Sequence, residues 1–260
     1  MHTLAYSNAQ GTITCNGLRS ANGEEFNTFL VEEVSARLND EEEAVDFRSL
    51  LNSLASTEFA QQNLRAILEV EHPEERAWAV GEALAEAWII REHGVLLPWN
   101  MARDKRTSQA SLPGADLVGF LIQEGKTRLV LGEVKSSSES KTPPQVMTSR
   151  EGMSHQLEKL ATDLNLLFTL LRWLSPRCLN SDFEPHFKAA TALLLESGHK
   201  AISLFGVLIR DTQPDGKDLH RCGQHLGNIV QAPASCHLLA LYIPCLISTL
   251  SDRIQAGGAV

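Results

Sequence analysis

Two carboxylates and a lysine at the ends of two apolar runs are the side chains of this sequence best placed to do chemistry together. Asp116 starts the first run, and Glu133 and Lys135 close the second. Side chains alternate between the faces of a strand, so Glu133 and Lys135 point one way and Val134 points to the opposite, apolar face. Two carboxylates held close together repel each other unless a cation lies between them. A divalent metal is the usual partner, and Mg²⁺ prefers one or two carboxylates together with waters and phosphate oxygens.

The elements that must position these groups form a β-hairpin. Residues 114–122 and 127–135 are apolar runs of strand length, and the polar, glycine-bearing segment 123–126 separates them. This pattern predicts two neighbouring strands joined by a short loop. Asp116 on the first strand can then lie beside Glu133 on the second.

The charge distribution limits how this protein could bind nucleic acid. The net charge is −9 at pH 7, and nine acids with one base lie between Glu24 and Asp46, so the rest of the chain is close to neutral. No broad basic surface is expected, and strong affinity for DNA without help is not predicted. A partner that delivers the nucleic acid fits this balance better.

Length, hydropathy and cysteine content limit the classes of protein to which this chain can belong. The 260 residues can bury one large core or two small ones. No apolar run approaches a membrane span, so no membrane partner is expected, and residues 1–10 lack the features of a signal peptide. The five cysteines are odd in number and scattered, which predicts free thiols in a reducing, cytoplasmic compartment.

Helical periodicity dominates the first part of the chain. Residues 1–23 are polar, with a short strand expected near 12–14, and residues 24–75 carry apolar side chains at steps of three and four. We predict an acidic, helical N-terminal region over 1–75 and a second domain over 76–260. The acidic face of the first region is either a solvated surface or a docking face for a basic partner protein.

A further helix is predicted over 76–92, between a proline that suits a helix start and a glycine that suits a helix end. Glu82 lies beside the apolar stripe of this helix and Glu86 lies one step further round. Glu82 is therefore the preferred candidate for reaching the carboxylates, with Glu86 as the alternative. A short strand is expected over 95–99. The polar loop that follows carries basic side chains that are either solvated or in contact with phosphate, namely Arg103, Lys105 and Arg106.

After the hairpin, a serine-rich loop over 136–144 leads to a helix predicted over 153–174. The hydroxyls of this loop are candidates for contact with a phosphate backbone. Gln156, in the first turn of the helix, either faces the carboxylates or is a surface side chain. In the last third, strands are predicted over 201–210 and 237–244, a helix over 247–254, and either a strand or a helix over 187–196.

The motif of Asp116 followed by Glu133-Val134-Lys135 resembles the core of the PD-(D/E)XK nuclease superfamily, with Gly114-Ala115 before the aspartate. The resemblance implies an α/β fold with a restriction-endonuclease-like mixed sheet flanked by helices. It implies Mg²⁺, for which Mn²⁺ can substitute, with Asp116, Glu133 and Val134 as metal ligands. Lys135 would position or activate the attacking water.

The helices around the motif extend this resemblance. Members of the superfamily commonly carry a glutamate on the helix before the first strand and a glutamine on the helix after the Glu-x-Lys strand. Glu82 and Gln156 match these positions, which adds both to the implied catalytic set. The implied activity is metal-dependent hydrolysis of phosphodiester bonds in DNA.

More narrowly, the chain resembles the nuclease subunit of the Hachiman anti-phage defence system. The likeness lies in the size, the helical N-terminal region and the arrangement Gly-Ala-Asp-Leu-Val-Gly-Phe followed by Gly-Glu-Val-Lys-Ser-Ser. It implies a superfamily 2 helicase, encoded nearby, that restrains the nuclease until phage replication or damaged DNA is sensed.

Other hypotheses remain open from the sequence. The chain could be a catalytically inert member of the same fold that binds DNA or a partner, or a helical regulatory protein in which the motif arises by chance. The last hypothesis predicts that Asp116 and Glu133 lie far apart. A zinc site is a minor alternative because its candidate ligands, His220, Cys222, His225, Cys236 and His237, fit no standard spacing. Motifs of ATPases, Rossmann enzymes and α/β-hydrolases do not occur.

Overall fold

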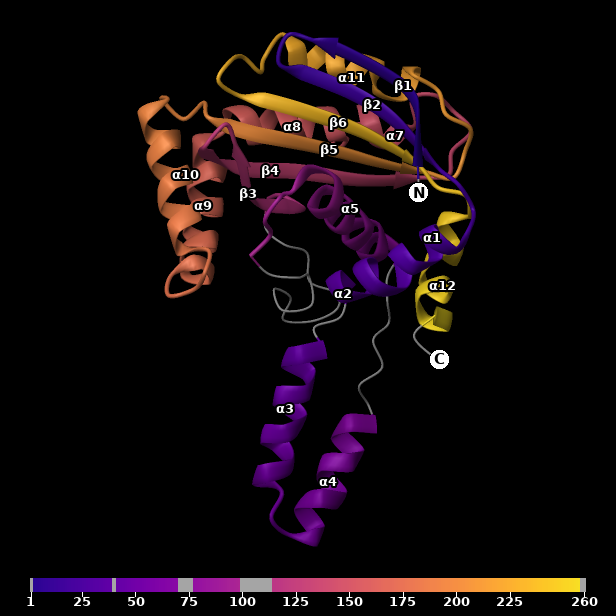
Figure 1. Ribbon diagram of the computed structural model, residues 1–260, viewed down its shortest axis with the longest axis vertical. Helices are drawn as coiled ribbons and strands as arrows, with labels where there is room; N and C mark the ends of the chain where they lie inside the picture. The colour runs from indigo at the N-terminus through magenta and orange to yellow at the C-terminus, as the bar shows by residue number, and fades with distance from the viewer. Residues whose placement is uncertain (1, 39–40, 70–76, 99–113, 258–260) are drawn as a thin grey trace.

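The chain folds around a six-stranded mixed sheet with the strand order β1-β2-β6-β5-β4-β3. The computed structural model, shown in Figure 1, describes residues 2–38, 41–69, 77–98 and 114–257. Neighbouring strands are parallel from β2 through β6 and β5 to β4, and antiparallel in the outer pairs β1–β2 and β3–β4. Leu96 adds one isolated bridge to Phe120 of β3. The strands are β1 (His2–Gln10), β2 (Ile13–Ser20), β3 (Leu117–Gln123), β4 (Lys126–Ser137), β5 (Ile202–Arg210) and β6 (Ser235–Tyr242).

Helices cover both faces of this sheet, which confirms the expected α/β class (Figure 1). One face is covered by α5 (Ala77–His93) together with α1 (Glu24–Thr28), the π-helical η1 (Phe29–Val34), α2 (Ser35–Leu38) and α12 (Leu250–Gly257), which follows the short η2 (Ile247–Thr249). The other face is covered by α7 (Gln145–Thr148), α8 (Met153–Thr162), α9 (Leu164–Cys178), α10 (Glu184–Glu196) and α11 (Lys217–Gly227). None of the described helices combines the length and apolarity needed to cross a membrane.

Two more helices, α3 (Glu41–Leu54) and α4 (Glu58–Glu69), pack against each other and extend away from the sheet in Figure 1. Ala55 and Leu64 are buried in this helical pair, whereas Leu54 and Phe59 are more than half exposed. The helices predicted for this part of the sequence are confirmed.

Each face of the sheet has its own apolar core, and the central strands contribute to both. Every residue of β5 is buried, because the strand has a neighbour on each side and helices on each face. This explains its nearly continuous apolar sequence, which is typical of parallel strands. Parallel strands need a long crossover connection, and α7 to α10 supply it between β4 and β5.

The short strand expected near residues 12–14 is confirmed as part of β2, but it is longer than expected and is one half of a hairpin. Residues 2–20 form the hairpin β1–β2, and β2 pairs in parallel with β6, so this segment belongs to the same sheet as the second predicted domain. The first strand, β1, was missed because it is an edge strand and most of its side chains are exposed, so it needs no apolar alternation. Gly11, with φ +59, makes the turn between the two strands.

Three other expectations from the sequence are refined by the structure. The helix predicted over 153–174 is divided at Asp163, whose carboxylate accepts hydrogen bonds from the backbone N–H groups of Asn165 (2.9 Å) and Leu166 (3.1 Å) and so caps α9. The undecided segment 187–196 is helical, within α10, which has Pro185 in its first turn. The strand expected over 95–99 is reduced to the bridge at Leu96, and the basic loop residues Arg103, Lys105 and Arg106 lie outside the described residues.

A histidine on β6 makes folding stability depend on pH. Burial, followed by the nearby His93, lowers the pKa of His237 from 6.5 to about 4. The ring stacks on Phe205 with centroids 4.9 Å apart, and its Nδ1 lies 3.1 Å from the hydroxyl of Thr14. Between pH 6.5 and 4 the unfolded chain therefore binds a proton here that the folded protein does not, so stability falls as the pH is lowered through this interval.

We expect the variant His237→Gln to lose less stability on acidification than the wild type. The difference should approach about 3 kcal/mol at pH 4, since each pKa unit corresponds to about 1.4 kcal/mol. Urea unfolding at pH 7.5 and at pH 4 measures this difference. The exposed His220 provides the control, because His220→Gln should follow the wild type at both pH values. Equal acid sensitivity of His237→Gln and wild type would contradict the assignment.

Candidate active site

The pairing of β3 with β4 brings Asp116 and Glu133 together. Leu117 pairs with Gly132, and the N–H of Asp116 donates to the carbonyl of Gly132 at 3.0 Å, which puts Asp116 opposite Glu133. One carboxylate oxygen of Asp116 accepts a hydrogen bond from the N–H of Val134 at 2.8 Å. The hypothesis that the motif arises by chance predicted two distant carboxylates, and this geometry contradicts it.

Glu133 is a buried acid in an unfavourable electrostatic environment. Its residue is 6% exposed, and its carboxylate accepts a hydrogen bond from the ammonium of Lys135. Burial and then the charge of Asp116 raise the pKa of Glu133 to about 7, against the opposing effect of Lys135. Asp116 and Glu133 are therefore two carboxylates held close together, an arrangement in which a divalent cation would be stabilised.

The structure adds Glu151, which the sequence analysis did not select. Its charge is one of the contributions that raise the pKa of Glu133, so it lies within electrostatic reach of the site. Gln156, in the first turn of α8, donates to the carboxylate of Glu151 at 3.1 Å. Gln156 therefore forms its hydrogen bond with an exposed acid near the site and not with Asp116 or Glu133. The signal in the sequence was an acid directly before the helix that carries the candidate glutamine.

The two glutamates of α5 differ from expectation in their burial. This helix is buried on almost all sides instead of along one stripe, and Glu86, not Glu82, is the more deeply buried, at 5% exposed. Glu86 forms an ion pair with Arg37 of α2, with 2.6 Å between Nε and Oε2. Glu82 is partly exposed, so the argument that it lies closer to the buried edge is wrong.

Glu82 nevertheless lies on the part of α5 that packs against the end of β4. A Cβ atom built on its neighbour Gly81 would be 2.5 Å from the hydroxyl oxygen of Ser136, the residue after Lys135. Ser136 and Lys135 point to opposite faces of the strand, because consecutive residues alternate. The structure therefore groups Asp116, Glu133 and Lys135 directly and places the helix of Glu82 against the reverse side of the same strand end.

The serine-rich loop after β4 makes contacts within the protein. The hydroxyl of Ser138 donates to Asp211 at 2.7 Å, and the hydroxyl of Ser137 accepts from the N–H of Glu139 at 3.2 Å. These side chains are thus used to fix the loop, which weakens the expectation that they contact phosphate.

The candidate zinc ligands are divided between the two faces of the sheet. Cys222 and Cys236 are buried in the core beneath α11, whereas His237 stacks on Phe205 in the core beneath α5. His225 instead pairs with Glu158, with 2.8 Å between Nε2 and Oε2. Among the described residues, no group of three or more histidine, cysteine, aspartate or glutamate side chains is arranged to hold a metal ion.

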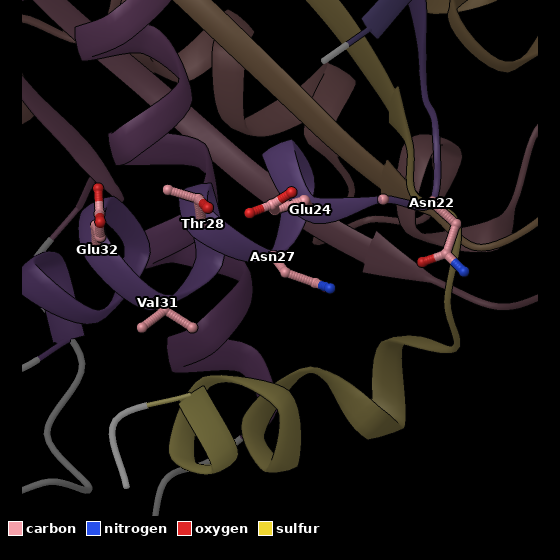
Figure 2. Close-up of a pocket in the computed structure, with 7 residues that line it drawn as sticks. Asn22, Glu24, Asn27, Thr28, Val31 and Glu32 are labelled. Carbon is pink, nitrogen blue, oxygen red and sulfur yellow. The ribbon is translucent and has the colours of Figure 1, made fainter. Parts of the chain in front are cut away.

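A hollow of about 490 Å³ lies elsewhere, along α1 and η1 (Figure 2). It is lined by amide, hydroxyl and carboxylate side chains, including Asn22, Asn27, Glu24 and Glu32. Among the described residues that line it, Glu24 and Glu32 are acids and none is a lysine, arginine or histidine, which disfavours an anionic substrate there. It is separate from the pair Asp116 and Glu133.

The residues at the end of the β3–β4 hairpin fit a magnesium ion. Asp116 and Glu133 offer two carboxylates, and Val134 between Glu133 and Lys135 offers a main-chain carbonyl. Mg²⁺ needs few protein ligands because it keeps several waters and takes substrate oxygens. The observation that supports this fit is the strand pairing that puts Asp116 opposite the buried Glu133.

Comparison with models of protein families and with curated proteins gives no match to this chain.

Proposed function

We propose that this chain is a Mg²⁺-dependent endonuclease that hydrolyses phosphodiester bonds in DNA, with the core arrangement of the PD-(D/E)XK superfamily. The observation that carries the proposal is the position of Asp116 opposite the buried Glu133, with Lys135 bonded to Glu133. The order of elements also supports it, since a helix with an acid precedes the hairpin and a helix with a glutamine follows it.

Each residue has a distinct role in the proposed mechanism. Asp116, Glu133 and the carbonyl of Val134 would hold Mg²⁺, which would neutralise charge on the phosphate and lower the pKa of a water. The ammonium of Lys135, which donates to the carboxylate of Glu133, would orient the water or stabilise the negative charge that develops on the phosphate. Gln156 orients the carboxylate of Glu151 at the border of the site. Glu82 would support the site from the opposite face of the sheet, where its helix packs against the end of β4.

We further propose that this nuclease is the cytoplasmic effector of a Hachiman-type anti-phage complex with a superfamily 2 helicase. The resemblance to that family is the basis, and the charge of the chain supports it. With a net charge of −9, the protein has little electrostatic attraction for a polyanion, so a partner would supply the grip on DNA.

Cleavage assays with and without metal test the proposal. The purified chain is incubated with supercoiled plasmid and with single-stranded RNA, in Mg²⁺, Mn²⁺ or EDTA, alone and together with the helicase encoded nearby. We expect cleavage of DNA in Mg²⁺ and Mn²⁺ and none in EDTA. Restraint by the helicase until damaged DNA is added would support the defence complex. Absence of cleavage in every condition, with intact DNA or partner binding, would favour an inert binding module instead.

A further inference from the structure

A buried arginine ends β5 on the face of the sheet that also carries Glu133 and Lys135. Arg210 is 1% exposed, and it pairs in register with Ser137 of β4, two residues after Lys135. Residues two apart on a strand share a face, so Arg210, Ser137 and Lys135 lie on one side of the sheet. A guanidinium in such a place is costly unless its charge and its donors are satisfied.

The guanidinium closes the segment that follows the Glu-x-Lys strand. Its Nη1 donates to the carbonyl of Ser137 at 3.1 Å, and its Nη2 donates to the carbonyl of Lys141 at 3.2 Å. The two carbonyls are four residues apart, so one planar side chain fixes both ends of a short loop. Asp211, the next residue, accepts from the hydroxyl of Ser138 at 2.7 Å and strengthens the same attachment.

A buried acid on α11 balances the charge of this arginine. Oδ2 of Asp218 lies 3.3 Å from Nε of Arg210, and both side chains are at most 1% exposed. Tyr242 of β6 donates to the same carboxylate at 2.9 Å, and its hydroxyl lies 3.1 Å from that of Tyr6 on β1. A polar chain therefore runs from the N-terminal hairpin to the loop behind Lys135.

Stability alone does not account for this ion pair. Replacing a buried ion pair by apolar side chains of similar volume is often neutral or stabilising, because desolvation of the charges offsets their attraction. Apolar side chains have no N–H groups to donate. A guanidinium is planar and can donate to two backbone carbonyls at once in a fixed geometry. The fixed contact with two backbone carbonyls is thus what this ion pair provides and apolar side chains would not.

We propose that Arg210, held by Asp218, is a positioning residue for catalysis, which fixes the end of β4 and the loop 137–141 so that Lys135 faces the reacting phosphate. The inference rests on the proposed nuclease function. Arg210 touches neither Glu133 nor Lys135 through its guanidinium hydrogen bonds; it acts on them through the backbone of Ser137 and Lys141. It therefore affects the chemical step and not the binding of substrate.

The double variant Arg210→Met/Asp218→Leu tests the proposal, because it removes both charges together. We expect a melting temperature close to that of the wild type, a kcat lowered at least tenfold for Mg²⁺-dependent DNA cleavage, and a KM within threefold of wild type. Arg210→Lys keeps the positive charge beside Asp218 but cannot span the two carbonyls, so it should also lose kcat. This second variant keeps the test decisive if the double variant folds poorly.

Tryptic cleavage after Lys141 provides a readout that does not depend on activity. We expect the double variant to be cut there faster than the wild type, with cleavage after the exposed Lys200 as the internal reference. A double variant with wild-type kcat, or one whose KM rises while kcat is unchanged, would overturn the positioning role. A wild type that never cleaves DNA would overturn the proposed function, while the tryptic assay would still show whether Arg210 holds the loop.

Discussion

Replacing Glu133 by glutamine should lower Mg²⁺-dependent DNA cleavage by about a hundredfold or more, the order of loss seen when one group that stabilises transition-state charge is removed. The carboxylate is the buried member of the pair that holds the metal, and the amide has no charge to offer. The same change should leave the melting temperature unchanged or higher, because it removes a buried charge opposite Asp116. Initial rates on supercoiled plasmid and thermal unfolding without metal give the two values.

Lys135→Met should lose activity to a similar degree, since the methylene stem is kept and only the ammonium is removed. The matched control is Glu158→Gln, which changes an acid of α8 that pairs with His225 on the same side of the sheet. That control should cleave DNA at the wild-type rate. Full activity in Glu133→Gln would show that the nuclease centre lies elsewhere in the molecule.

The largest expected effect on folding comes from Gly132, the residue before Glu133. A Cβ atom at this position would lie 2.5 Å from the carbonyl oxygen of Phe205 on β5 and 2.9 Å from a side-chain carbon of Leu117 on β3. The first of these atoms belongs to the backbone of a fully buried strand and cannot move aside without disturbing the sheet. Gly132→Ala should therefore destabilise the protein by about 1–3 kcal/mol, the usual range for overpacking.

Denaturant unfolding measures this loss, and Gly216→Ala is the control. Gly216 has φ −60, and its added Cβ would meet nothing closer than 3.8 Å, so the control should differ from the wild type by less than about 0.5 kcal/mol. Because Gly132 precedes Glu133, folded Gly132→Ala protein should also cleave DNA more slowly. Equal unfolding midpoints for the two variants would show that the sheet absorbs the extra methyl group without cost.

The centre of the site could be derived from the sequence because one turn determines it. Gln123 pairs with Lys126 around Glu124 and Gly125, both with positive φ (53° and 72°), which is the geometry of a two-residue hairpin turn. Once that turn is set, the register follows residue by residue, and Asp116 must meet Glu133. The alternation of apolar and charged residues near the end of the second strand predicted that Glu133 and Lys135 share one face and Val134 lies on the other.

The support around the centre could not be derived in this way. Glu86 and Arg210 are buried charged residues whose charges are neutralised by partners distant in the sequence. A local sequence pattern does not identify such a partner. Glu151 lies within electrostatic reach of Glu133 because the helix that follows it, α8, packs against β4. The strand β1 was missed for the opposite reason, since an edge strand with exposed side chains has the composition of a loop.

The parallel pairing of β2 with β6 has a consequence for the synthesis of this protein. The hydroxyls of Tyr6 and Tyr242 that meet across this part of the sheet belong to residues 236 positions apart. Contacts between such distant residues form late, because a long stretch of chain must first be closed into a loop. During translation the hairpin β1–β2 is synthesised before β6. It can pair with β6 only after β6 has left the ribosome. The strands therefore join the sheet in a different order from the one in which they are translated. The hairpin β3–β4, with its two carboxylates, can form before β1 and β2 are paired with β6.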